Sequence, residues 1–140
     1  MDAKRSINTR IWSDPFFESL EPDLKLLWLY FLCNEYTNML GIYELSIKRI
    51  SFDTGLSFER VSNALKGFER VRKAFFIDGY LFLPNFVKNQ SYNPNMEKVA
   101  QAIFKELPNS IKTKLLEFGV ESFESLRKGL QTLPKIEIEI

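Results

Sequence analysis

The chain has 140 residues, with 19 basic and 18 acidic side chains, a formal net charge of +1 and 45% hydrophobic residues. This composition is that of a globular protein, and it excludes a disordered or collagen-like chain. The length suits one domain, or one domain with a short appendage. A balanced total charge gives no bulk attraction to nucleic acid or to a membrane surface.

Missing residue types exclude several kinds of catalytic and metal site. The sequence has no histidine and a single cysteine, Cys33, which excludes zinc sites built on His and Cys ligands and Ser–His or Cys–His nucleophile pairs. The six glycines never take the spacing of a phosphate-binding loop. We therefore expect no enzymatic activity, no metal and no cofactor.

The apolar segments predict a protein without a membrane partner. The longest apolar run, residues 26–33, is far shorter than the ~18–20 residues that cross a bilayer. No pattern typical of a secretory signal is found. We expect a cytoplasmic protein, in which Cys33 is a buried thiol in a reducing compartment.

Charge is distributed unevenly along the chain. Residues 11–46 carry six acids and one base, whereas residues 47–74 carry seven bases and three acids. A basic stretch beside an acidic one suggests a molecule with one face suited to a polyanion. Solvated helix faces give the same pattern, so this interpretation depends on the fold.

The first third of the chain predicts a short helix and a longer one. Asp14-Pro15 starts a short turn or helix, and Pro22 suits the first position of the longer helix. The spacing of a core-facing stripe is shown by Leu24, Leu27, Trp28, Phe31 and Leu32. The other faces of this helix are apolar too. We therefore expect it to be covered on most sides, by the rest of the domain or by a second copy of the chain.

Residues 47–65 predict a helix-turn-helix. Gly55 suits the left-handed residue that ends the first helix, and Ser57 is a good N-cap for the second. The small side chain of Ser51 leaves room where the two helices cross. In this motif the second helix can enter the DNA major groove. A helical hairpin that does not bind DNA has the same pattern.

The second helix of this motif has a polar face, to which we assign base contacts. Its members are Asn63, Lys66 and Arg70, with Arg60 and Ser62 beside them. Asn pairs with adenine, and Arg or Lys pairs with guanine or phosphate. Glu59 shares the face and repels phosphate, so it either weakens the assignment or contacts cytosine. An ordinary solvated helix face is the alternative.

Other cations near the motif are assigned to phosphate, which gives affinity without sequence choice. They are Lys48, Arg49, Arg72, Lys73 and Lys88. With ~4–6 phosphate contacts, the logarithm of affinity should fall against the logarithm of salt concentration with a slope of roughly −4 to −5.

Residues 74–83 predict a β-hairpin. Asp78-Gly79 between two apolar, β-leaning runs is typical of a type I′ turn, and residues 41–45 favour a further brief strand. A helix-turn-helix followed by a hairpin is a winged helix, in which the tip at residues 78–80 could reach a groove or the phosphates. The expected fold is mainly α with a small β-hairpin: a winged helix-turn-helix with additional C-terminal helices.

Beyond Pro94 the chain changes character. Basic and acidic residues are equal in number there, and helices are expected from Asn95 to Glu106 and from Asn109 or Ser110 onward. We divide the chain into three parts: a winged-helix DNA-binding domain (1–94), a helical extension that packs on it (95–121) and a linker or tail (122–140).

Four runs of the sequence together resemble one protein family. They are residues 12–20, 26–32, 34–45 and 78–90, and their most specific pieces are Thr-Asn-x-x-Gly-Ile-Tyr-Glu and Asn-Phe-x-Lys-x-Gln. Over about residues 4–108 the chain resembles the N-terminal winged-helix domain of bacteriophage replication-initiation proteins, the DnaD-type primosome or replisome-organiser proteins. The sequence departs from the family pattern at Glu21, where Ser or Thr is usual, and at Asn89, where His is usual.

The resemblance implies a function in DNA replication. It implies binding of double-stranded origin DNA as a step toward loading a replicative helicase, with the helicase or its loader as protein partner. It also implies a bacterial cytoplasm, a phage or prophage gene, and a further C-terminal domain beyond a linker. Two alternatives stay open: a winged-helix protein–protein assembly module, self-associating through the helix around residues 24–32, and a transcriptional regulator with the same DNA-binding chemistry.

Overall fold

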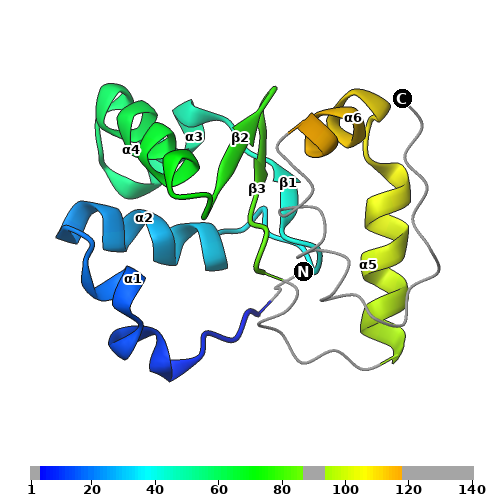
Figure 1. The fold of residues 1–140 in the computed structure, drawn as a ribbon, viewed down its shortest axis with the longest axis horizontal. Helices are drawn as coiled ribbons and strands as arrows, with labels where there is room; N and C mark the ends of the chain where they lie inside the picture. Colours follow the sequence, from blue (N-terminus) through cyan, green and yellow to red (C-terminus); the bar gives the residue numbers. More distant parts are fainter. Residues whose placement is uncertain (1–3, 87–93, 118–140) are drawn as a thin grey trace.

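The computed structural model describes residues 4–86 and 94–117 of the chain. In this part the protein is mainly helical with one small antiparallel sheet, as the sequence predicts (Figure 1). The elements in chain order are η1 (Thr9–Ser13), α1 (Pro15–Glu18), α2 (Pro22–Cys33), β1 (Ile42–Glu44), α3 (Ile47–Thr54), α4 (Phe58–Arg70), β2 (Phe75–Ile77), β3 (Tyr80–Phe82), α5 (Pro94–Glu106) and α6 (Asn109–Glu117).

The α3–turn–α4 unit is built from the local signals that the sequence carries. Gly55 ends α3 in the left-handed conformation, with φ 77°, and its N–H bonds to the carbonyl oxygen of Ser51 at 2.9 Å. The hydroxyl of Ser57 caps α4 by accepting a hydrogen bond from the N–H of Arg60 at 3.0 Å. The Ser51 hydroxyl donates to the Leu56 carbonyl at 2.6 Å. The predicted helix boundaries and the turn are therefore confirmed.

The β-hairpin also forms as predicted, and its turn is held on two sides. Asp78 and Gly79 both have positive φ, 48° and 83°, as a type I′ turn requires. The Leu45 N–H donates to the Gly79 carbonyl at 2.8 Å. On the other side, the ammonium group of Lys114 in α6 lies 3.0 Å from the Asp78 carboxylate. The tip thus rests against β1 and α6 and does not project alone.

Alternation along three-residue strands buries the sheet on both faces. β3 pairs with β1 and with β2, in the order β1-β3-β2. One row across the sheet joins Ile42, Phe82 and Phe75, and the next joins Tyr43, Leu81 and Phe76. Because successive side chains of a strand point to opposite faces, the first row lies in one core cluster and the second in another.

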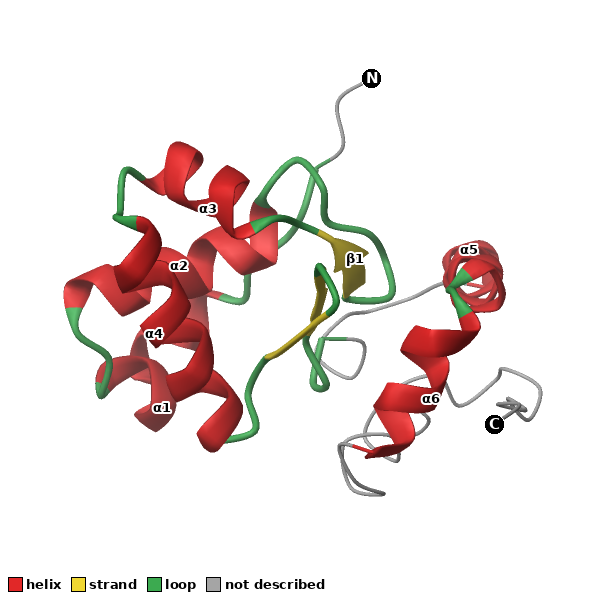
Figure 2. Cartoon of the chain, turned by 90° about the horizontal axis from the view of Figure 1, so that it is seen from above, coloured by secondary structure: helices red, strands yellow, loops and turns green. Residues whose placement is uncertain are grey.

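The two core clusters belong to different sets of helices. The cluster on one face contains Ala100, Phe104 and Leu107 of α5 and its following turn, with Ile111 and Leu115 of α6. The cluster on the other face contains buried side chains of α2, α3 and α4. Figures 1 and 2 show the result: the sheet separates α5 and α6 from α1–α4. The C-terminal helices therefore cover the side of the sheet that faces away from α4.

Helix α2 is less covered than its sequence predicts. Leu27 and Phe31 are fully buried, but Leu26 is 43% exposed and Cys33 is exposed. The prediction that Cys33 is buried is wrong, because its place on the helix turns it away from the core beside Leu26 and Leu29. In the described ranges no helix has both the length and the apolar character to cross a membrane.

The Thr-Asn-x-x-Gly-Ile-Tyr motif closes the loop between α2 and β1. The Asn38 side chain accepts hydrogen bonds from the N–H groups of Leu40 and Gly41, both at 2.9 Å, and donates to the Ile42 carbonyl at 2.7 Å. The Tyr43 hydroxyl donates to the carbonyl oxygen of Phe31, at the end of α2, at 2.6 Å. One of the two runs that carry the family resemblance most specifically thus ties β1 to α2 by hydrogen bonds.

Gly41 and Gly55 allow a direct test of this loop. Both have φ 77°, but a Cβ at Gly41 would lie 2.5 Å from the Cβ of Phe86, whereas one at Gly55 would have no neighbour within 4 Å. We expect Gly55→Ala to cost about 1–2 kcal/mol of unfolding free energy, from the left-handed backbone alone. Gly41→Ala should cost about 3 kcal/mol or more, because overpacking adds to the same strain. Denaturant unfolding measures both; equal losses would contradict the close approach of Phe86.

Candidate nucleic-acid interface

Helix α4 is strongly amphipathic, and its polar face is open to solvent. Val61, Ala64, Leu65 and Phe68 are buried. The residues of the opposite face, all exposed, are Glu59, Asn63, Lys66 and Arg70. The predicted stripe is therefore one continuous surface along the helix. Ser62 is half-buried at its edge.

The stripe is free of local partners. Within the part of the chain that the structure describes, the side chains of Asn63, Lys66 and Arg70 make no hydrogen bond or ion pair. The described C-terminal helices lie on the far side of the sheet and leave this face uncovered (Figures 1 and 2). The helix dipole favours Glu59 in the first turn and Arg70 in the last, which accounts for part of the charge pattern without any ligand.

A groove runs beside the stripe, between α4, the start of α3 and β2. It has a volume of about 210 Å³, and its lining residues are Ile47, Ser62, Leu65, Lys66, Glu69 and Phe76. Its lining is mostly apolar, and Lys66 and Glu69 add one charge of each sign. The groove joins the exposed face of α4 to the hairpin.

Arg60, predicted beside the stripe, is held by two carboxylates of another helix. Its guanidinium lies 2.6 Å from the Glu21 carboxylate and 3.5 Å from that of Asp23, both at the N-terminal end of α2. Glu21 occupies the N-cap position of α2 but makes no capping hydrogen bond with its side chain, as expected for a poor cap. The first turn of α4 is therefore tied to α2 at the surface.

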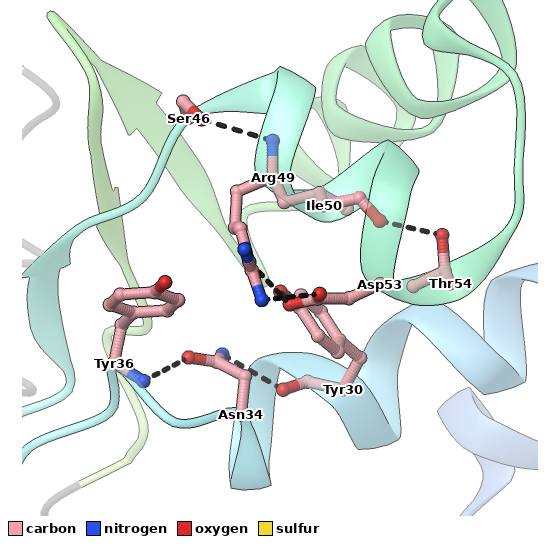
Figure 3. A network of polar contacts seen from close by, with 8 residues as sticks. All are labelled: Tyr30, Asn34, Tyr36, Ser46, Arg49, Ile50, Asp53 and Thr54. Carbon is pink, nitrogen blue, oxygen red and sulfur yellow. Dashed lines mark hydrogen bonds and ion pairs between the residues drawn. The ribbon is translucent and has the colours of Figure 1, made fainter.

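Arg49, predicted to contact phosphate, belongs to a polar network between α2 and α3 (Figure 3). Its guanidinium lies 3.0 Å from the Asp53 carboxylate, to which Tyr30 of α2 donates a hydrogen bond at 2.6 Å. The guanidinium carbon also lies 5.8 Å and 5.3 Å from the ring centres of Tyr36 and Phe52. The hydrogen bond from the Tyr30 hydroxyl, with help from Arg49, holds the pKa of Asp53 below its usual range.

The remaining predicted cations are spread around the fold. Lys48 is exposed on α3. The ammonium of Lys73 lies 5.0 Å from the ring centre of Phe16, on the side of α1. Arg72 has φ 59° in the turn after α4, and its guanidinium carbon lies 6.0 Å from the ring centre of Phe75. Lys88 lies outside the described residues. The structure thus gathers the stripe of α4 but does not gather the predicted phosphate contacts around it.

Two exposed phenylalanines near the α3–α4 turn have no place in the sequence-based assignment. Phe58, the first residue of α4, is 60% exposed, and Phe52 of α3 is 77% exposed. Position was the available signal for Phe58, since it directly follows the N-cap Ser57 and precedes the buried stripe.

Exposed cations and an amide along one helix can contact phosphates and base edges. Among the described residues, no three or more His, Cys, Asp or Glu side chains are close enough together to hold a metal ion.

Comparison with known proteins gave no match: no family model, no curated protein and no solved structure matches the chain.

The network in Figure 3 predicts a pH-dependent stability. Because the pKa of Asp53 is lowered by the Tyr30 hydroxyl and by Arg49, the contribution of its carboxylate is complete above the ordinary value of about 3.9. The contribution is lost as pH falls through the lowered value. Asp53→Asn should therefore lower the unfolding free energy at pH 7, and its difference from the wild type should shrink in acid.

Tyr30→Phe is the companion variant, since it removes the hydrogen bond and keeps the ring. Chemical unfolding of both variants and of the double variant at several pH values gives the coupling between the two side chains. A difference between Asp53→Asn and the wild type that stays constant down to strong acid would contradict the assigned network.

Proposed function

We propose that the protein binds duplex DNA through a winged helix-turn-helix, as part of phage-type replication initiation. In this arrangement α4 lies in the major groove, α3 crosses the backbone and the β2–β3 hairpin is the wing. The observation that carries the proposal is the exposed, partner-free stripe of Asn63, Lys66 and Arg70 on α4. The order of helices and strands from α2 to β3 is the one that this fold requires.

The stripe supports a division between base and phosphate contacts. Asn63, near the middle of the helix, can pair with the adenine edge. Lys66 and Arg70 follow it toward the C-terminal end, and Lys48 is exposed on the neighbouring helix. These three cations are the ones available for phosphate, because Arg49 and Arg60 are occupied by carboxylates. Binding of this kind needs no chemical step.

The replication role rests on the family resemblance, above all on the run that closes the loop before β1. By that resemblance the protein partner is a replicative helicase or its loader. A transcriptional regulator would use the same DNA chemistry, so the two roles are separated by the DNA that is bound. A gel-shift series with DNA from around the gene itself, random duplex and single strand makes this comparison.

Removing the two cations of the stripe should weaken duplex binding. Lys66→Ala with Arg70→Ala should lower affinity for duplex DNA roughly tenfold or more at low salt. With three such cations, the slope of log affinity against log salt is expected at about −3 for the wild type, and it should become less negative by about 2. Because both side chains are exposed, the melting temperature should change little.

The matched control is Lys98→Ala with Lys105→Ala, which removes two exposed cations from α5 on the other side of the sheet. Net charge changes by the same amount in both double variants. Equal loss of affinity in the two would show that only bulk charge matters, and normal binding by the α4 variant would show that the stripe is not the interface.

A protein–protein assembly module is the second candidate, and the outer face of α2 favours it. Pro22, Leu26 and Cys33 are exposed there and Leu29 is half-buried. Exposed apolar side chains that share one helix face are typical of association surfaces. The self-association that was expected through the helix around residues 24–32 would use this face.

Sedimentation tests the second candidate. Association through apolar contacts predicts a dimer that resists high salt, whereas DNA binding is weakened by salt. Leu26→Lys should then yield a monomer, while Val99→Lys, at a position of similar exposure on α5 (45% against 43%), should not. A wild-type protein that is monomeric at all salt concentrations would remove this candidate.

A further inference from the structure

The most unusual side chain on the exposed part of α4 is the one at its start. Phe58 is the first helical residue, fixed in place by the Ser57 cap, and it is 60% exposed. Its ring makes no aromatic or cation contact among the residues that the structure describes. Single exposed apolar side chains are common on protein surfaces, so this one matters for its position at the start of the proposed recognition helix.

The charges of the first turn disfavour a phosphate as the partner of Phe58. Glu59, next in sequence, is an exposed carboxylate. Arg60 is the cation of this turn, and it is held by Glu21 and Asp23. The free cations of the helix, Lys66 and Arg70, lie in its second half. The start of α4 is thus suited to uncharged groups, and its end to phosphates.

We infer that Phe58 reads thymine, by packing its ring against the 5-methyl group in the major groove. The inference rests on the proposed function. In a helix-turn-helix the N-terminal residues of the recognition helix contact base edges. The thymine methyl is the apolar group on those edges, and Phe is one of the side chains that contact it. Ser62 lies one turn further along the helix.

The surroundings of Phe58 favour a base over a protein surface. Ser57 and Glu59 are its exposed polar neighbours in sequence, and Ser62 lies one turn away. A single apolar side chain in polar surroundings matches a single methyl group, whereas protein interfaces use contiguous apolar patches. Phe52, although more exposed, is covered on one side by the Arg49 guanidinium at 5.3 Å, so it serves as a control.

The test removes the methyl group and the ring separately. The probes are an alternating A·T duplex and the same duplex with deoxyuridine in place of every thymidine. The wild-type protein should bind the thymine duplex about fourfold more tightly than the uracil duplex for each methyl group contacted. This factor corresponds to the burial of one carbon, which contributes about 0.8 kcal/mol. Phe58→Ala should bind both duplexes with the affinity that the wild type has for the uracil duplex.

Phe52→Ala should keep the preference of the wild type. A second pair of probes is an alternating G·C duplex with either cytosine or 5-methylcytosine, which restores a methyl group at the same ring position. The wild type should prefer the methylated duplex, and Phe58→Ala should bind the two duplexes equally. Because Phe58 is exposed, both variants should keep the wild-type melting temperature.

The outcomes separate this inference from the proposed function. Absence of duplex binding by the wild type at any salt concentration overturns both. Salt-dependent binding with equal affinity for the thymine and uracil duplexes overturns only the role of Phe58. A preference for thymine that persists in Phe58→Ala, or a loss of affinity in that variant for both duplexes alike, also overturns it.

Discussion

The central strand β3 is hydrogen-bonded along both edges and packed on both faces, and the positions of all the surrounding helices depend on it. Leu81 points into the core shared with α2, α3 and α4, and Phe82 points into the core shared with α5 and α6. With only three residues in the strand, a shift of register by one would exchange these two side chains between the faces of the sheet. Neither core would then contain the side chain that fills it. The alternation of apolar residues in β3 is thus the constraint that keeps two helical layers apart.

This arrangement also determines which surfaces stay free. The outer face of the sheet, which carries Ile42, Phe75 and Ile77, is fully used by α5 and α6. On the other face of the sheet, the apolar side of α4 packs against α2 and α3, and its polar side is left to solvent. The stripe on α4 is therefore open as a consequence of how the two layers are divided.

Local sequence signals predicted the fold well. Gly55, Ser57 and the Asp78-Gly79 pair act through backbone conformation and capping, which depend on near neighbours, so their outcome could be derived from the sequence. The exposed face of α4 followed from helical periodicity in the same way. The pairing of Arg49 with Asp53, four residues apart on one helix, also follows from the sequence spacing, and it sets Arg49 apart from the other cations assigned to phosphate.

Contacts between distant segments could not be derived from the sequence. Arg60 meets Glu21 across 39 residues, and the exposure of Cys33 depends on whether anything covers the second apolar face of α2. Periodicity identifies the core-facing stripe, but it does not say whether an opposite apolar face is covered as well. The role of the Thr-Asn-x-x-Gly-Ile-Tyr run as a loop closure likewise required the hydrogen bonds of Asn38 and Tyr43 to be seen.

Under the proposed function, the contact between Asp78 and Lys114 bears on how much DNA one copy reads. Because the hairpin turn lies against α6, α4 would be the main reading element. Its 13 residues extend about 20 Å, the length of about six base pairs. A sequence of that length recurs by chance about once in 4,000 base pairs, far too often to mark one place in a genome. Under the proposed function, an origin would be distinguished by several such short binding sites in tandem, each occupied by one copy of the chain.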